Sequence, residues 1–174
     1  MQNISDQGRK AREFLQRIQK EKDKNKDASI QDLLMKNLLD RKNLLDLNIV
    51  VGLDISGSIS SSQFAQFIRQ VNAIKGLSRV KIIETDTCVQ SFYDFSLVNN
   101  RRNIAKLGGG GGTDFTEAFK AIEEIKPDAV LFMTDGFVSG RPRTPSMPVG
   151  WILTHDGVNP YGFGEVVYRL GTHS

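Results

Sequence analysis

The stretch LNIVVGLDISGSIS, residues 47–60, decides the fold class of this chain. Its first seven residues are mostly apolar and several are β-branched, which is typical of a strand covered on both faces, as in a parallel sheet. Asp54 follows this apolar run directly, and serines then occupy every second position: Ser56, Ser58 and Ser60. A buried strand gains nothing from a carboxylate at its end, so this corner predicts a site that requires oxygen atoms.

Apolar strands and amphipathic helices alternate along the rest of the sequence. The spacing of apolar residues predicts helices at 64–74 and 115–125, the second of them after five consecutive glycines at 108–112. Further strands are predicted at 79–85, 89–95, 128–136, 149–155 and 165–170, and the one at 89–95 could be antiparallel. This alternation predicts an α/β domain with an open, mainly parallel, Rossmann-like sheet that is flanked by helices.

The α/β domain is expected to span residues 47–171, after an N-terminal helical extension over residues 1–46. The first part of this extension is polar, and residues 19–27 mix both charge signs without one apolar residue. It is therefore predicted to be a solvated helix or a disordered arm. A second helix, capped at Ser29 with Asp32 three residues later, places its leucines on one face and is expected to pack on the domain.

The distribution of charge argues against nucleic-acid binding by the α/β domain. The first 46 residues hold 11 of the 23 Lys and Arg and 8 of the 20 Asp and Glu, so the net charge of +3 lies there. The single cysteine, Cys88, cannot form an internal disulfide, which fits a cytoplasmic location. The sequence has no apolar run of about 18 residues, so no membrane-spanning helix is expected.

Oxygen-bearing side chains follow two of the predicted strands and the glycine run. Ligands of open α/β sheets bind beyond the carboxyl ends of the strands, so these three loops are expected to meet at one edge. Carboxylates and hydroxyls suit Mg²⁺, Mn²⁺ or Ca²⁺ better than they suit a structural zinc ion. The predicted metal ligands, direct or through water, are Asp54, Ser56, Ser58, Thr113 and Asp135.

The spacing of these residues explains how they could converge. Alternate positions in an extended loop point the same way, which would aim Asp54, Ser56 and Ser58 together. Asp114 is expected to orient the serines by accepting hydrogen bonds, and Asp86 could reach the rim of the metal. Three glycines allow the sharp turns and close backbone approach that the site requires: Gly57, Gly112 and Gly136.

Three motifs, in this order on this strand–helix pattern, resemble the metal-ion-dependent adhesion site (MIDAS) of von Willebrand factor A-type (VWA) domains: DISGS, GGTD and MTDG. More narrowly, the chain looks like the VWA-like C-terminal domain of bacterial predicted metal-dependent peptidases, which are commonly paired with MoxR-type AAA+ ATPases. This likeness rests on VVGLDISGSIS, ETDTCVQ, GGGGGTDF, PDAVLFMTDG, VGWILT and YGFGEVV.

The resemblance implies a module that binds protein through a divalent metal. In VWA domains, a carboxylate from a partner protein completes the coordination of the metal. For this chain, the resemblance implies that the partner is a MoxR-type AAA+ ATPase. Only 46 residues precede the first strand, where the family usually carries a peptidase-like region. The chain is therefore expected not to be an enzyme.

Other interpretations stay open. A metal-dependent hydrolase or phosphotransferase with Asp54 as nucleophile would want a second acid two residues later, where Ser56 stands. A nucleic-acid adaptor would work through the N-terminal helices. DISGS alone could be a helix N-cap, which explains one motif of three. Phe137 and Val138, directly after MTDG, belong either to the core or to an exposed contact beside the metal.

Overall fold

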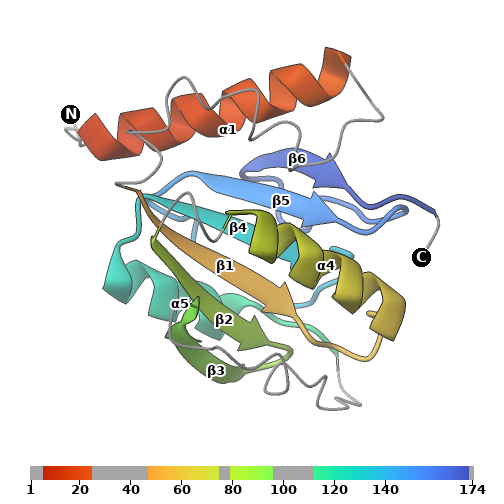
Figure 1. Cartoon of the computed structure of the whole chain (residues 1–174). Coiled ribbons are helices and arrows are strands. Elements are labelled where there is room, and N and C mark those ends of the chain that lie inside the picture. The colour runs from red at the N-terminus through yellow and green to blue at the C-terminus, as the bar shows by residue number, and fades with distance from the viewer. Residues whose placement is uncertain (1–5, 25–46, 75–78, 96–111, 173–174) are drawn as a thin grey trace.

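Figure 1 shows the computed structural model of the chain, which describes residues 6–24, 47–74, 79–95 and 112–172. The described residues form a six-stranded sheet in the spatial order β3-β2-β1-β4-β5-β6. All neighbouring strands pair in parallel except β2 and β3, which are antiparallel. The predicted α/β class, with an open and mainly parallel sheet, is confirmed.

The elements lie close to their predicted positions. The strands are β1 (Asn48–Asp54), β2 (Arg79–Thr85), β3 (Val89–Asp94), β4 (Ala129–Thr134), β5 (Val149–Leu153) and β6 (Glu165–Arg169). The helices of the described segments are α1 (Asp6–Lys24), α4 (Ser61–Ile74) and α5 (Thr116–Ile125). None of these helices combines the length and the apolar composition that crossing a bilayer requires.

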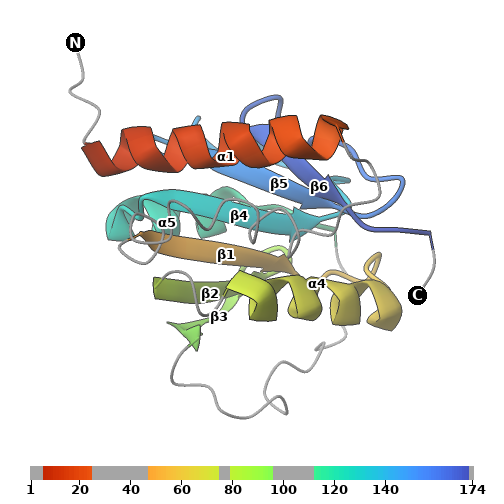
Figure 2. The same cartoon turned by 45° about the horizontal axis from the view of Figure 1, so that its top comes forward.

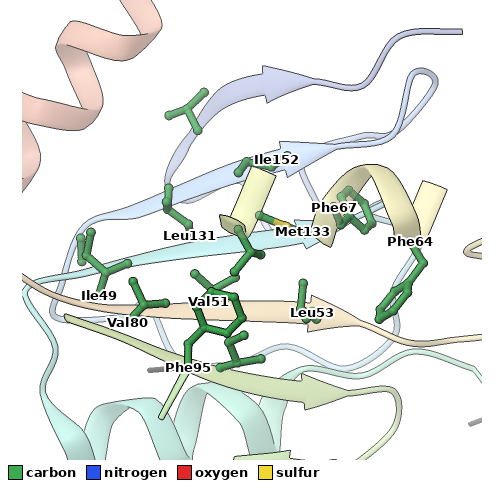
Figure 3. Packing of buried hydrophobic residues seen from close by; sticks show 14 of the residues in the cluster. Ile49, Val51, Leu53, Phe64, Phe67, Val80, Phe95, Leu131, Met133 and Ile152 are labelled. Carbon is green, nitrogen blue, oxygen red and sulfur yellow. The ribbon is translucent and has the colours of Figure 1, made fainter. Parts of the chain in front are cut away.

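Helices cover both faces of the sheet. In Figures 1 and 2, α1 and α4 lie on one face and α5 lies on the other. The sheet residues below α4 are mostly aliphatic, and Figure 3 shows Met133 close to Phe67 of the helix, with Val51 and Leu131 farther along the same face. Because both faces are covered, β1 and β4 are buried along almost their whole length, as their apolar sequences predict.

Aromatic rings dominate the face that α5 covers. Phe119 of α5 stacks on Phe132 of β4 with 5.4 Å between ring centroids, and meets Trp151 edge-on at 6.0 Å. Phe132 also lies directly over Gly52 of β1, where a β-carbon would come within 2.4 Å of the ring. β1 and β4 are therefore packed tightly just before their carboxyl ends.

Of the two predicted alternatives, a solvated helix and a disordered arm, the structure shows a helix, and most of its described side chains are exposed. It also packs on the sheet, which was not predicted. Helix α1 lies against β6, and Leu15 is only 2% exposed within the core of the α4 face. Gly150 of β5 leaves room for Leu15, since a β-carbon there would lie 3.1 Å from its Cδ2 atom. The second predicted helix and the boundary between residues 46 and 47 fall outside the described residues, so both stay predictions.

Candidate metal centre

Asp54 ends β1 with its side chain completely buried. Its Oδ1 accepts a hydrogen bond from the Ser56 backbone N–H at 2.9 Å, and its Oδ2 accepts one from the Thr134 hydroxyl at 2.6 Å. Burial raises the pKa of Asp54, hydrogen bonds from Ser56 and Thr134 oppose the rise only in part, and the charge of Asp135 adds to it. Among the described residues, the one charge that acts on Asp54 is the negative charge of Asp135.

The two serines of the first loop lie together beside this carboxylate. Ser56 is 1% exposed, and its hydroxyl oxygen lies 3.1 Å from that of Ser58. Ser58 and Gly57 are exposed, so the loop runs from the buried strand end out to solvent. Ile55 between the polar residues is buried in the core, as the alternation predicts.

Asp135 begins the loop after β4 and is 7% exposed. Its Oδ1 accepts a hydrogen bond from the Phe137 N–H at 3.0 Å, and its carbonyl oxygen accepts one from the Val158 N–H at 2.9 Å. Gly136 has a φ of +80°, and a β-carbon there would lie 1.6 Å from the Val158 carbonyl oxygen, so the turn requires glycine. Phe137 is 60% exposed, whereas Val138 packs against the core of the α5 face.

The segment after the glycine run lies between two other loops. Thr113 is 5% exposed, and its carbonyl oxygen accepts hydrogen bonds from the N–H and the hydroxyl of Ser139 at 2.6 and 3.1 Å. The N–H of Asp114 donates to the carbonyl oxygen of Asp86 at 2.9 Å. Thr113 is thereby held between the loop after β4 and the turn after β2. Gly112 is the one glycine of the run within the described residues.

Asp114 holds a different set of partners from the predicted one. Its Oδ1 accepts a hydrogen bond from the Thr116 N–H at 2.8 Å, at the start of α5. Its carboxylate also lies against Gly140, where a β-carbon would fall 2.3 Å from the nearer oxygen. Within the described residues no hydrogen bond joins Asp114 to Ser56 or Ser58, because the helix start and the backbone of Gly140 enclose its carboxylate.

The Asp86 carboxylate is engaged within its own turn. Its Oδ1 accepts hydrogen bonds from the backbone N–H groups of Thr87 at 2.6 Å and Cys88 at 3.2 Å, and from the Gln90 amide at 3.1 Å. Partial burial acts to raise the pKa of Asp86, but the hydrogen bonds from Gln90, Cys88 and Thr87 outweigh it and lower the pKa. The contact of Asp86 with the other loops of the site is made by its backbone, because its carbonyl oxygen accepts the hydrogen bond from the Asp114 N–H.

Thr134 was not selected by the sequence analysis, yet it contacts the central carboxylate. It ends β4, is completely buried, and accepts a hydrogen bond from the Gly136 N–H at 3.0 Å while donating to Asp54. Its signal was present in the sequence, because Thr134 is the one hydroxyl residue of an otherwise apolar strand and stands directly before Asp135.

Tyr161 is a second residue that the sequence analysis missed. Its hydroxyl accepts a hydrogen bond from the Phe115 N–H at 3.2 Å and donates to the Ser139 carbonyl oxygen at 3.3 Å, which ties the loop of Thr113 to the loop after β4. Burial, with a smaller contribution from the negative charges of Asp114 and Asp54, raises the pKa of Tyr161 to about 12. Its partners lie more than 20 residues away, so no local pattern marks this role.

The chemistry of the donor set fits a hard divalent cation. The carboxylates of Asp54 and Asp135 lie close enough to interact electrostatically, and the serine hydroxyls adjoin the first of them. Among the described residues, no group of three or more His, Cys, Asp or Glu is gathered in the manner of a zinc or polycarboxylate site. Any ion at this edge would therefore be held by few charges and several neutral oxygens.

Comparison with known proteins gives one family match. Residues 49–169 match the model of a protein family described as "VWA-like domain (DUF2201)". No curated protein matches the chain significantly. The matched residues include every candidate ligand named above.

Proposed function

The chain belongs to this family of VWA-like domains, a type of domain that serves generally in protein interaction, and from that premise we propose that it binds its partner through a divalent metal ion. The observation that carries the proposal is the buried Asp54, which has Asp135 as a charged neighbour and no positive charge of the described residues acting on it. Burying a carboxylate without a counter-charge is costly. A divalent cation would remove that cost.

The residues of the site have separate tasks under this proposal. The Ser56 N–H and the Thr134 hydroxyl fix the orientation of the Asp54 carboxylate, and the Phe137 N–H fixes that of Asp135. The bound ion would supply a Lewis-acidic centre that accepts a carboxylate from the partner. The residues that would hold Mg²⁺, or Mn²⁺ or Ca²⁺, are Asp54, Ser56, Ser58, Thr113 and Asp135.

We propose a MoxR-type AAA+ ATPase in the cytoplasm as the partner. The support is the sequence likeness to the VWA-like domains that accompany such ATPases, together with the single cysteine. We assign no catalytic role, because Ser56 stands where a phosphatase of the Asp-nucleophile type would carry its general acid.

Calorimetric titration of the metal-stripped protein with Mg²⁺ and Mn²⁺ tests this function. We expect saturable binding at a single site, and no binding to Asp54→Ala. Adding the purified ATPase should tighten metal binding, because the partner contributes a ligand to the ion. Absence of binding by the wild type, both alone and with the ATPase, would contradict the proposal.

Thr134→Val is expected to weaken metal binding by about 10–100-fold, since it removes the hydroxyl that orients the Asp54 carboxylate. Thr85→Val is the matched control: Thr85 is equally buried and ends the neighbouring strand, but its hydroxyl donates to the Cys88 carbonyl oxygen. Calorimetry on both variants makes the comparison. Equal losses of affinity would show that Thr134 acts through general stability and not through Asp54.

A further inference from the structure

A groove of about 670 Å³ lies between α5 and the loop that follows β4. Its floor is apolar, because the almost fully buried ring of Phe119 and the buried Pro142 both line it. The described residues that line it come from two segments, α5 and the loop after β4: Thr116, Phe119, Lys120 and Glu123 of the helix, and Pro142, Arg143, Thr144 and Ser146 of the loop.

The walls of the groove carry two positive charges. Lys120 of α5 and Arg143 of the loop both line it, and both are exposed. The one acid among the lining residues, Glu123, is engaged: its Oε1 accepts a hydrogen bond from the Ser146 N–H at 2.6 Å and its Oε2 one from the Ser146 hydroxyl at 2.8 Å. Glu123 therefore fastens the loop to the helix, so the groove is formed before any ligand arrives.

The groove adjoins the candidate metal centre. Thr116 lines it, and the N–H of Thr116 donates to the Asp114 carboxylate, which directly follows Thr113. Gly140, two residues before Pro142, lies against the same carboxylate. A segment of a partner protein that placed one side chain at the carboxyl edge of the sheet could therefore place its next residues in the groove.

We infer that the groove binds an acidic, extended segment of the partner protein, next to the residue that coordinates the metal. This rests on the proposed function for the position of the anchoring carboxylate. Lys120 and Arg143 attract the acidic side chains, and the floor of Phe119 and Pro142 covers their aliphatic stems. Lys120 and Arg143, with the acidic Glu123 beside them, are a poor match for a nucleic-acid backbone, because proteins bind such a backbone with stripes of many basic residues.

Fluorescence anisotropy with a fluorescein-labelled hexaglutamate peptide tests the groove. Titrations are made in Mg²⁺ and in EDTA, with the wild type, with Lys120→Glu/Arg143→Glu, and with Arg69→Glu/Arg79→Glu as the control. The control reverses the same number of charges at exposed residues of α4 and β2, away from the groove. We expect the groove variant to weaken peptide binding by about tenfold or more in both buffers, and the control by less than about twofold.

The outcomes separate this inference from the proposed function. If Mg²⁺ does not change peptide affinity but the groove variant still lowers it, the groove stands and metal-mediated binding fails. If Mg²⁺ raises affinity while the groove variant and the control behave alike, the groove is overturned. Failure of the wild type to bind the peptide, or tighter binding of a labelled hexathymidylate that shows the same variant dependence, would also overturn it. Calorimetric titration with Mg²⁺ should give the same metal affinity for the groove variant as for the wild type.

Discussion

Asp54→Asn should abolish divalent-metal binding and yet leave the metal-free protein at least as stable as the wild type. Asp54 is buried with no positive charge of the described residues acting on it, and burial already raises its pKa. The asparagine has the same shape but no charge, so the folded state no longer has to bury a carboxylate. We expect a gain of roughly 1 kcal/mol in the free energy of unfolding, in the presence of EDTA.

The metal dependence of stability should change in the opposite direction. At a Mg²⁺ concentration of about 100 times the dissociation constant, a ligand that binds only the folded state stabilises the wild type by about 2.7 kcal/mol. Asp54→Asn should gain none of this, because it lacks a charged ligand of the ion. Urea unfolding of both proteins, with Mg²⁺ and with EDTA, measures the four free energies.

Asp156→Asn is the control for these four measurements of the free energy of unfolding. It makes the same chemical change at an exposed position, in the loop after β5, and should alter neither stability by more than about 0.5 kcal/mol nor the response to Mg²⁺. A large loss of stability in metal-free Asp54→Asn would mean that the carboxylate is an essential hydrogen-bond acceptor for Ser56 and Thr134. The case for a cation at this edge would then lose its physical basis.

The strand ends were predictable because two periodicities in the sequence agree. Apolar runs with β-branched residues mark strands that are buried on both faces, and helical spacing marks the helices that cover them. The sequence alone therefore assigns Asp54 and Asp135 to one edge of the sheet. Whether Phe137 belongs to the core or to the surface could not be predicted in the same way. Its exposure follows from the turn at Gly136 and from the Val158 backbone, which approaches from a distant loop.

The partners of Asp114 and the packing of α1 lay beyond sequence reasoning for a similar reason. Asp114 contacts Gly140 across a gap of 26 residues, and no local pattern reveals that the glycine comes close enough to enclose the carboxylate. Helix α1 is polar overall, and Leu15, which is buried beside Gly150, is too weak a signal against the charged residues around it. Local composition predicts that the helix is exposed, whereas the missing side chain of Gly150, on a strand far away in the sequence, allows Leu15 to be buried.

Phe132→Ala should lower the free energy of unfolding by about 3–5 kcal/mol, which is a large fraction of the 5–15 kcal/mol typical of a domain. The ring is completely buried, lies over Gly52, and contacts Phe115 at 4.4 Å and Phe119 at 5.4 Å between centroids. Its removal leaves a cavity that the backbone of β1 cannot fill, because Gly52 has no side chain. Urea unfolding monitored by Trp151 fluorescence measures the loss.

Phe137→Ala is the matched control, since it deletes the same ring from a position that is 60% exposed and lies three residues beyond β4. It should change the free energy of unfolding by less than about 0.5 kcal/mol.

Phe132 also sits between Gly52 and α5, so its loss should loosen the spacing of the strand ends that carry Asp54 and Asp135. Mg²⁺ affinity should therefore fall in Phe132→Ala and persist in Phe137→Ala. Equal Mg²⁺ affinities in the two variants would show that the contact between Phe132 and Gly52 does not set the geometry of this edge.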